Sequence, residues 1–418
     1  MKKLVGILLL FSTAVFAREL TLDEAIDMAL TNSREIKTSE LSRENSELNL
    51  KRAFKTALPK VTYNGTYQRS EYERKIDSMD HRKRGFSQDI GIYQPIFQGG
   101  SIIAGIQGAK AYENMANLMY LAEKRDIRLE TIEIYSNIVR LEKNLAVLES
   151  SKKELEERHK KQEMQLNMRL ITKADILKTE YTILEVDSNM IGTKNSIEIE
   201  KKKLKVKLQI PEKEILTVKP FEIENNLLSK IDFNRDVEDA KNSSISAKIA
   251  KDKVTVAQAE KTIARADLLP KVQAFAKYET TEKRHYNDTI DDASWVGGVS
   301  VDWNVFEFGK GYDSYSISKN KERIEELNND QTKDDIEIKV TNNYLDLVRL
   351  DKLKSSRQKA LEAAQENFKM DKERYNAGLI STVDYLLSET QLRQAAVDYN
   401  SVTIDYLVAF EKYRSALI

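Results

Sequence analysis

The sequence carries one set of landmarks twice, and this repeat restricts the fold more than any other feature. Leu58-Pro-Lys-Val61 recurs as Leu269-Pro-Lys-Val272 at an offset of 211 residues. The stretch 376–387 has a weaker copy at 169–177, at an offset of 209 residues. Phe306 and Gly309 also match Phe97 and Gly100 at the second offset. Matches that keep their order and spacing across both halves indicate a duplicated structural unit.

Each copy predicts the same order of elements: helix, strand, loop, strand, very long helix, tip and shorter helix. We place the first repeat at 18–210, a connecting element at 211–232 and the second repeat at 233–418. The long helical hairpins are expected over 101–208 and 309–415. Each begins with a run of roughly 65–70 residues without proline, which would span about 100 Å as a helix.

Helical periodicity extends beyond the hairpins. Thr21-Leu-Asp-Glu24 predicts a capping box that opens a short helix. A second helix is expected from about Arg34 to Ala57, and one uninterrupted helix from about Arg235 to Leu269. In the first long helix, apolar residues spaced by four and three predict a coiled-coil seam: Ile134, Ile138, Leu141, Leu145, Leu148 and Leu155.

Two segments change to a period of two, which predicts strands that are apolar on one face. We place one strand pair at 60–96, around a charged loop at about 71–85. The other pair is placed at 271–305, around a polar loop that ends near Asp292. Strands of about ten residues are long enough for a membrane hairpin.

Trp295 and Trp303 lie at the two ends of the apolar face of the last predicted strand, with Gly297, Val299 and Val301 between them. This spacing favours aromatic girdles at two membrane interfaces. The alternative is that both tryptophans belong to the core of a β-sandwich.

The two tips predict a helix stop followed by a helix start. Gly378 suits a left-handed C-cap. Ser381 and Asp384 have the spacing of a capping box. The first tip repeats this pattern with Thr172 and Asp175.

Composition excludes several classes of protein. The chain has 67 basic and 67 acidic residues, so it lacks the basic surface of a nucleic-acid-binding protein. With no Cys, three scattered His residues and no Gly-rich phosphate loop, the sequence predicts no enzyme, no metal site and no cofactor. Lys2 and Lys3, the apolar run 4–11 and Val15-Phe-Ala17 predict a secretory signal peptide over 1–17.

Four strands cannot close a barrel, and lipid does not tolerate open strand edges. Three chains would supply twelve strands, which is above the roughly eight at which side chains still fill a barrel. The sequence therefore predicts an α+β membrane protein. Its trimeric 12-stranded β-barrel, with four strands per chain, would continue as a helical coiled-coil barrel in aqueous space.

The chain resembles the TolC family of outer-membrane efflux proteins. The resemblance rests on Leu20-Thr-Leu-Asp-Glu-Ala-Ile26, both Leu-Pro-Lys-Val elements, Gln94-Pro-Ile-Phe97 with Gly99 and Gly100, and Tyr375-x-x-Gly378 followed by Ser381-x-x-Asp384. It implies a homotrimer in the bacterial outer membrane with a large periplasmic portion. It also implies a periplasmic adaptor (membrane fusion) protein and an inner-membrane pump of the RND or ABC type as partners.

The resemblance further implies a periplasmic gate at Asp384, Asp175 and Tyr375. It implies adaptor contacts at the hairpin tips through Gly378, Leu379, Ser381, Leu170 and Thr172. Two positions depart from the family pattern, since Ile380 replaces an expected Arg and Leu387 replaces a second acidic ring. We therefore expect a single acidic ring and a closed state held by fewer polar contacts.

Both aspartates also fit a purely structural helix-start role, and that alternative stays open. The overall prediction is a passive exit duct of a tripartite efflux or type I secretion system. The rival interpretation is a secreted or surface coiled-coil scaffold or adhesin without a channel.

Overall fold

The computed structural model describes residues 18–72, 81–221, 226–285 and 288–418. The predicted signal peptide over 1–17 lies outside the described residues. By their contacts, the described residues form two compact units. Among the described residues, the helical unit comprises those within 18–39, 121–244 and 334–418, and the sheet unit those within 40–120 and 245–333. Each unit therefore takes segments from both halves of the sequence.

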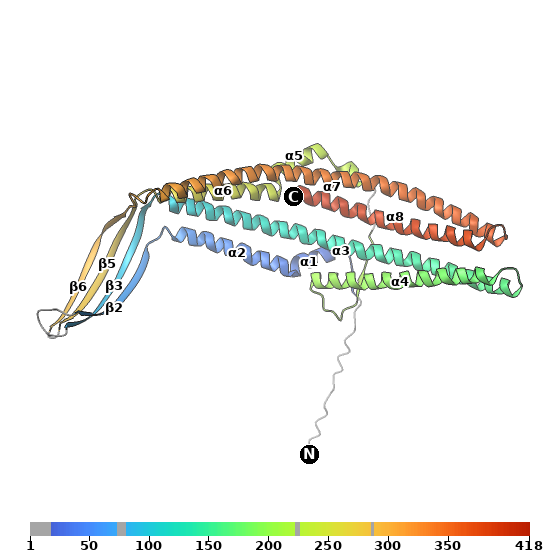
Figure 1. Ribbon diagram of the computed structural model, residues 1–418, viewed down its shortest axis with the longest axis horizontal. Coiled ribbons are helices and arrows are strands. Elements are labelled where there is room, and N and C mark those ends of the chain that lie inside the picture. Colours follow the sequence, from blue (N-terminus) through green and yellow to red (C-terminus); the bar gives the residue numbers. More distant parts are fainter. Residues whose placement is uncertain (1–17, 73–80, 222–225, 286–287) are drawn as a thin grey trace, which may run out of the picture. The chain divides into compact units, whose positions relative to one another are not determined.

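The helices of the two halves have equal lengths, pair by pair. α1 and α5 have 11 residues each, α2 and α6 have 22, α3 and α7 have 67, and α4 and α8 have 36. No helix in the described ranges is both long enough and apolar enough to cross a membrane. The helices are α1 (Leu22–Asn32), α2 (Arg34–Lys55), α3 (Ser101–Asn167), α4 (Lys173–Leu208), α5 (Phe233–Ser243), α6 (Ile245–Ala266), α7 (Lys310–Asn376) and α8 (Thr382–Leu417) (Figure 1).

The expected single helix over 235–269 is wrong. α5 and α6 are separated at Ser244, which is buried and has an extended ψ of 157°. Ser33 separates α1 from α2 in the same way, with a ψ of 139°. A residue with extended ψ cannot continue the helical hydrogen-bond ladder, so the helix must restart after it.

The predicted seam of α3 is only part of its buried surface. Ile138, Leu148 and Leu155 are buried as expected. Ile132 and Tyr135 are buried as well, on positions outside the seam. α3 therefore packs against neighbours on more than one side, which a two-stranded heptad pattern does not anticipate.

The connecting element contains a short strand that the sequence did not reveal. β4 (Leu216–Val218) pairs in parallel with β1 (Arg18–Leu20), and a short 3₁₀ helix, η1 (Leu227–Lys230), follows. The hydroxyl of buried Tyr135 lies 2.7 Å from the carbonyl oxygens of both Leu20 and Lys219. Burial raises the pKa of Tyr135 to about 12, so this hydroxyl stays a donor.

The strands are longer than predicted. They are β2 (Lys60–Tyr72), β3 (His81–Gln98), β5 (Lys271–His285) and β6 (Asp288–Asp302). The polar loop expected to end near Asp292 is therefore wrong, since the described residues before Asp292 belong to β5 and β6. Of the charged loop expected at about 71–85, residues 71–72 and 81–85 are strand, and residues 73–80 lie outside the described residues. Strand pairing uses backbone groups, so charged residues do not end the ladder. Trp303, by contrast, lies one residue beyond the end of β6.

The four strands form one antiparallel sheet in the order β2-β3-β5-β6 (Figure 1). Within the described part of the chain, β2 and β6 each pair on one side only. The register also aligns side chains across the sheet. For example, Tyr63 lies opposite Ile90, which lies opposite Tyr278, which lies opposite Trp295.

This alignment gathers the apolar residues on one face of the sheet. Exposed members of the face are Val61, Tyr63, Tyr67, Phe86, Ile90, Ile92, Trp295, Val299 and Val301. On the opposite face, Asn64 donates to Asp89 at 3.1 Å, and Lys277 lies 2.6 Å from Glu279. The sheet is thus apolar on one side and polar on the other, in agreement with the predicted alternation.

Candidate functional site

The turns at the two tips have the same backbone geometry. The N–H groups of Leu170 and Leu379 each bond to the carbonyl five residues earlier, both at 2.9 Å. This is the Schellman ending of a helix, which needs a left-handed residue. Gly378 supplies it with φ 75°, as predicted, and Arg169 occupies the same position in the first tip with φ 59°.

Each tip then restarts its helix with the expected capping box. The N–H of Ser381 donates to the Asp384 carboxylate at 3.2 Å, and the N–H of Thr172 donates to the Asp175 carboxylate at 3.2 Å. The hydroxyls of both capping residues also donate to these carboxylates. Hydrogen bonding from Ser381 holds the pKa of Asp384 below its usual range, and bonding from Thr172 does the same for Asp175.

Tyr375 connects the two hairpins inside the helical unit. Its side chain is 8% exposed, and its hydroxyl accepts a hydrogen bond from Gln162 of α3 at 2.9 Å. The same hydroxyl lies 3.0 Å from the hydroxyl of Thr382, at the start of α8. Thr382 in turn forms a hydrogen bond that lowers the pKa of Asp175. A chain of polar contacts therefore links α3, α7, α8 and the start of α4.

Arg158 lies beside this chain of contacts and is 3% exposed. Its guanidinium carbon is 4.7 Å from the ring centroids of both Tyr375 and Tyr385, so the cation sits against two aromatic faces. One nitrogen donates to Asn376 at 3.0 Å. The Nε atom has no hydrogen-bond partner among the described protein atoms. A cation of α3 thus packs against aromatic residues of both α7 and α8, whose ring centroids are 5.0 Å apart.

About one helical turn earlier, an ion pair connects α3 to α7 across the same interface. Lys372 of α7 lies 2.6 Å from Glu154 of α3, and the hydroxyl of buried Tyr385 donates to Glu154 at 2.8 Å. Burial raises the pKa of Glu154, but the hydrogen bonds from Lys372 and Tyr385 outweigh that effect and leave the pKa lowered. Glu154 therefore stays ionised and accepts bonds from both helices of the second hairpin.

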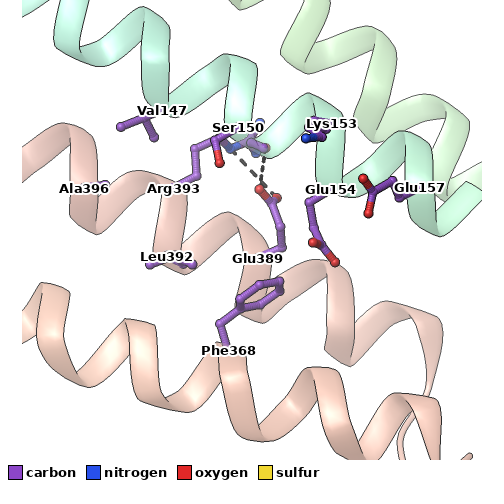
Figure 2. Close-up of a pocket in the computed structure, with 11 residues that line it drawn as sticks. Val147, Ser150, Lys153, Glu154, Glu157, Phe368, Glu389, Leu392, Arg393 and Ala396 are labelled. Atoms are coloured by element: carbon purple, nitrogen blue, oxygen red, sulfur yellow. Dashed lines mark hydrogen bonds and ion pairs between the residues drawn. The ribbon is translucent and has the colours of Figure 1, made fainter.

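A cavity of about 460 Å³ lies between α3, α7 and α8. Figure 2 shows that Glu389 of α8 points toward α3, with Phe368 of α7 below it. Glu389 is 3% exposed and accepts a short hydrogen bond from the Ser151 hydroxyl. Its other oxygen lies 4.0 Å from Nε of Arg393 and has no hydrogen-bond partner among the described protein atoms.

Burial raises the pKa of Glu389, and the like charges of Glu154 and Glu185 raise it further. The Ser151 hydroxyl and the Arg393 cation act in the opposite direction but do not cancel the effect of burial. This carboxyl is therefore the acid at the interface between the hairpins that is least suited to carry a charge.

The predicted girdle residues lie on or beside the apolar face of the sheet unit. Trp295 is 78% exposed, and its ring centroid lies 5.2 Å from that of Tyr278. Trp303 is 53% exposed and donates from its indole nitrogen to the Leu268 carbonyl at 3.2 Å. Eight residues separate the two tryptophans, which corresponds to about 26 Å along an extended strand. The apolar band of an outer-membrane barrel is about 25 Å tall.

Comparison with known proteins assigns the family. The family model described as outer membrane efflux protein matches residues 25–206 and 237–417, which together make up most of the chain. The chain belongs to the outer membrane efflux protein family. It is thus an efflux protein of the outer membrane, as the sequence predicted. No curated protein sequence matches it.

Solved structures share the fold of this efflux protein at low sequence identity. The CmeC outer membrane channel of Campylobacter jejuni is 16% identical with a TM-score of 0.83, covering 95% of this chain and 85% of that one. The outer membrane protein VceC of Vibrio cholerae is 14% identical with a TM-score of 0.80, covering 95% of each chain. The open-state MtrE channel of Neisseria gonorrhoeae is 16% identical with a TM-score of 0.75, covering 95% and 88%.

The predicted gate residues of the efflux protein have different surroundings in the structure. Tyr375 and Asp175 are connected through Thr382, as described above. Asp384 is exposed and contacts its own capping residue. Its helix-start role is confirmed, and the role of all three residues in gating stays a prediction. The predicted adaptor contacts form the exposed surface of the tips: Leu379 (75%), Leu170 (67%), Gly378, Ser381 and Thr172.

Sequence reasoning missed the α3 side of the network. The residue that follows Leu148 and Leu155 at heptad spacing is Gln162, which is fully buried. A polar residue at the next position of an apolar seam is a recognisable sign of a specific buried contact. Arg158, four residues before Gln162, gave no such sign, because a lone Arg on a charged helix is normally solvated.

The guanidinium of Arg158 is flat, and that shape lets it contact two rings and Asn376 at once. Arg158→Lys keeps the charge but removes the flat shape. We therefore expect amide hydrogen exchange in α7 around Tyr375 to become about tenfold faster, because the local contact is weakened. Arg374→Lys is the matched control, since that side chain is 60% exposed. Equal exchange rates in the two variants would contradict the role given to Arg158.

The raised pKa of Glu389 has a consequence for stability. Protonation favours the folded state, so this contribution is complete below the ordinary pKa of Glu and is lost as the pH rises through the raised value. Glu389→Gln should remove that loss and raise the melting temperature at neutral pH, with little change in acid. Melting curves between about pH 4 and pH 8 test this. Glu366→Gln, at an exposed position of α7, is the control and should leave the pH profile unchanged.

Proposed function

We propose that three copies of this efflux protein form a 12-stranded β-barrel in the outer membrane. A periplasmic barrel of helices would continue it as one passive exit duct. Twelve strands exceed the roughly eight whose interior side chains can fill a barrel, so the interior would hold water. The duct would carry out no chemistry, and its substrates would move down their gradient.

The sheet is the observation that carries this proposal. In the ranges that the structure describes, β2 and β6 have unpaired backbone groups at the two edges, and one face between them is apolar. In lipid, each unpaired N–H or C=O costs several kcal/mol, so the edges need partners. Pairing β6 of one chain with β2 of the next satisfies both edges and turns the apolar face toward lipid. The tryptophans Trp295 and Trp303 would then lie at the borders of the apolar band.

Exposed apolar residues on the helical unit also support association. On α4, Leu177, Leu184 and Ile191 recur every seven residues and are 52%, 67% and 62% exposed. On α7, Ile338 and Leu345 are 57% and 58% exposed at the same spacing. Heptad-spaced apolar residues are the seam of a coiled coil, and burying each of them contributes about 1.5–3 kcal/mol. Sister chains would cover both seams.

The helical tips would form the periplasmic entrance of the duct. A periplasmic adaptor protein would contact the exposed tip residues, and an inner-membrane pump of the RND or ABC type would supply the energy. The Asp384 carboxylates of three chains would gather around the axis and repel one another. The network around Tyr375 would hold the second hairpin against the first in the closed state. Arg158, Gln162 and Asn376 would contribute polar contacts there, and the expectation of fewer such contacts in the closed state stays a prediction.

A coiled-coil scaffold without a channel is the rival interpretation. A scaffold needs the helices and their exposed seams. It gives no reason for a sheet whose register aligns one apolar face across all four strands, between unpaired edges. The sheet therefore favours the duct.

Purified protein provides the direct test of the duct. We expect trimers that survive SDS without heating and dissociate on boiling, together with ion conductance in planar lipid bilayers. Leu184→Asp on the exposed α4 seam should reduce the yield of trimers, because a charge would be buried. Glu180→Asp, at a neighbouring exposed position, is the control. A monomer that conducts no ions would exclude the proposal.

The gate has its own test. Tyr375→Phe removes a hydroxyl whose hydrogen bonds contribute about 1 kcal/mol to the closed state, which predicts about a fivefold larger open population. Asp384→Ala should raise conductance as well. Asp384→Asn removes the charge but keeps a hydrogen-bonding side chain, so it separates the ring from the helix cap. Glu373→Ala, at an exposed position before the tip, is the control. Unchanged conductance in every variant would remove the gate assignment.

A further inference from the structure

The junctions between strand and helix are equivalent in the two repeats of the sheet unit. The side chain of Gln94 donates to the Ala57 carbonyl at 2.9 Å, and Trp303 donates to the Leu268 carbonyl at 3.2 Å. Position 303 lies 209 residues after 94, and position 268 lies 211 residues after 57, so both partners follow the repeat offsets. A contact seen at the end of β3 therefore predicts an equivalent contact at the end of β6.

The first junction, at the end of β3, is buried within the chain. After β3, Gly99 adopts φ 61° and lies against Ala266 at the end of α6, so closely that an added Cβ would come within 2.8 Å of it. Both residues are buried. This packing accompanies the pairing of β3 with β5, the strand that follows α6.

The second junction, at the end of β6, has the same left-handed backbone conformation, but its side chain is exposed. Phe308 occupies the position of Gly99 with φ 49°, a left-handed conformation that is strained for a bulky side chain. The side chain is 92% exposed, and its ring centroid lies 4.9 Å from that of Phe306, which is 73% exposed. The equivalent of Ala266 is Lys55 at the end of α2, which is exposed beside Phe54 (54%).

The chain cannot close this contact on itself. Lys55 leads into β2 and Phe308 follows β6, and these strands are the opposite edges of the sheet. Two intervening strands place those edges about 14 Å apart. A second copy of the chain brings its own β2 edge to β6, as the proposed trimer requires.

We infer that the β3–β5 junction is the template for the contact between subunits. Phe308 of one chain packs against the end of α2, at Lys55 and Phe54 of the partner subunit, and β6 pairs with the partner's β2 in the transferred register. This inference rests on the proposed trimer and specifies how its subunits meet.

The transferred register agrees with the chemistry of both edges. Tyr93 pairs with Phe275 within the chain, which places Asp302 opposite Asn64 of the partner subunit. The same register places Val299 opposite Tyr67, so the apolar faces of the two chains join without a break. A shift of one residue would turn one apolar face into the lumen.

Beyond the irregularity between Pro95 and Phe97, Gln98 pairs with Lys271. Transfer of this pair places Glu307 opposite Lys60 of the partner subunit, where the two opposite charges attract each other.

Disulfide cross-linking in the complete chain tests the inference, because the natural sequence has no Cys. We expect the pair Asp302→Cys and Asn64→Cys, and separately the pair Phe308→Cys and Lys55→Cys, to give covalent trimers that disappear on reduction. Ser300→Cys with Asn64→Cys is the control for a register shifted by two residues and should not cross-link.

The outcomes separate the inference from the proposed trimer. Trimers that link through Ser300→Cys, or through neither expected pair, would overturn the transferred contact and leave the trimer intact. A chain that stays monomeric would overturn both. A spin label at position 308 that is as accessible to lipid-dissolved oxygen as one at position 299 would show lipid in place of the partner subunit, and would also overturn the contact.

Phe308→Gly gives a second, independent measurement. Glycine adopts the left-handed backbone without strain, so this substitution should not harm the fold of one chain. We expect trimers in SDS to dissociate about tenfold faster, because each contact between subunits loses a buried ring. Phe306 stays in place as an internal reference. Equal or slower dissociation would mean that the exposed ring does not serve the interface.

Discussion

The unpaired backbone at the two edges of the sheet is the constraint on which the rest of the structure depends. β2 and β6 expose donors and acceptors that water can satisfy and lipid cannot. One face of the sheet is apolar, so lipid is the environment that suits it. The two requirements conflict in a single chain, and the proposed association of identical chains would resolve them together. The heptad-spaced apolar residues on α4 and α7 point to the same association through helices.

The interface between the hairpins contains more polar groups than an apolar coiled-coil seam, which suits the proposed gate. A purely apolar seam would be stabilised by its buried apolar surface and would resist opening. Here the seam ends at Gln162, and its place is taken by one cation, two tyrosine rings and a few hydrogen bonds. Nε of Arg158 and one oxygen of Glu389 have no hydrogen-bond partner within the described part of the chain. Buried polar groups that are only partly satisfied stabilise a contact less than apolar packing of the same size.

Most of the fold could be predicted from the sequence, because landmarks that recur at a nearly constant offset predict the same helices and strands in both halves. The boundaries of both hairpins follow from proline, glycine and capping residues at the tips. The break at Ser244 could have been inferred from Ser33, 211 residues earlier, whereas periodicity alone gives no sign of it. Strand ends were underestimated because charge was taken as a sign of loop. The contacts of Arg158 depend on how two hairpins pack, which no local pattern contains.

The two repeats differ most where their neighbours differ. At the tips, Arg169 and Gly378 share a left-handed turn, so sequence is free to vary there while the backbone stays the same. At the strand ends, Gly99 faces a helix of its own chain and leaves no room for a side chain, whereas Phe308 faces open space. A strained backbone that carries a bare aromatic ring has no advantage in an isolated chain. In the proposed trimer a sister subunit would cover the ring, and the asymmetry of the duplicated unit would then mark the place where one chain meets the next.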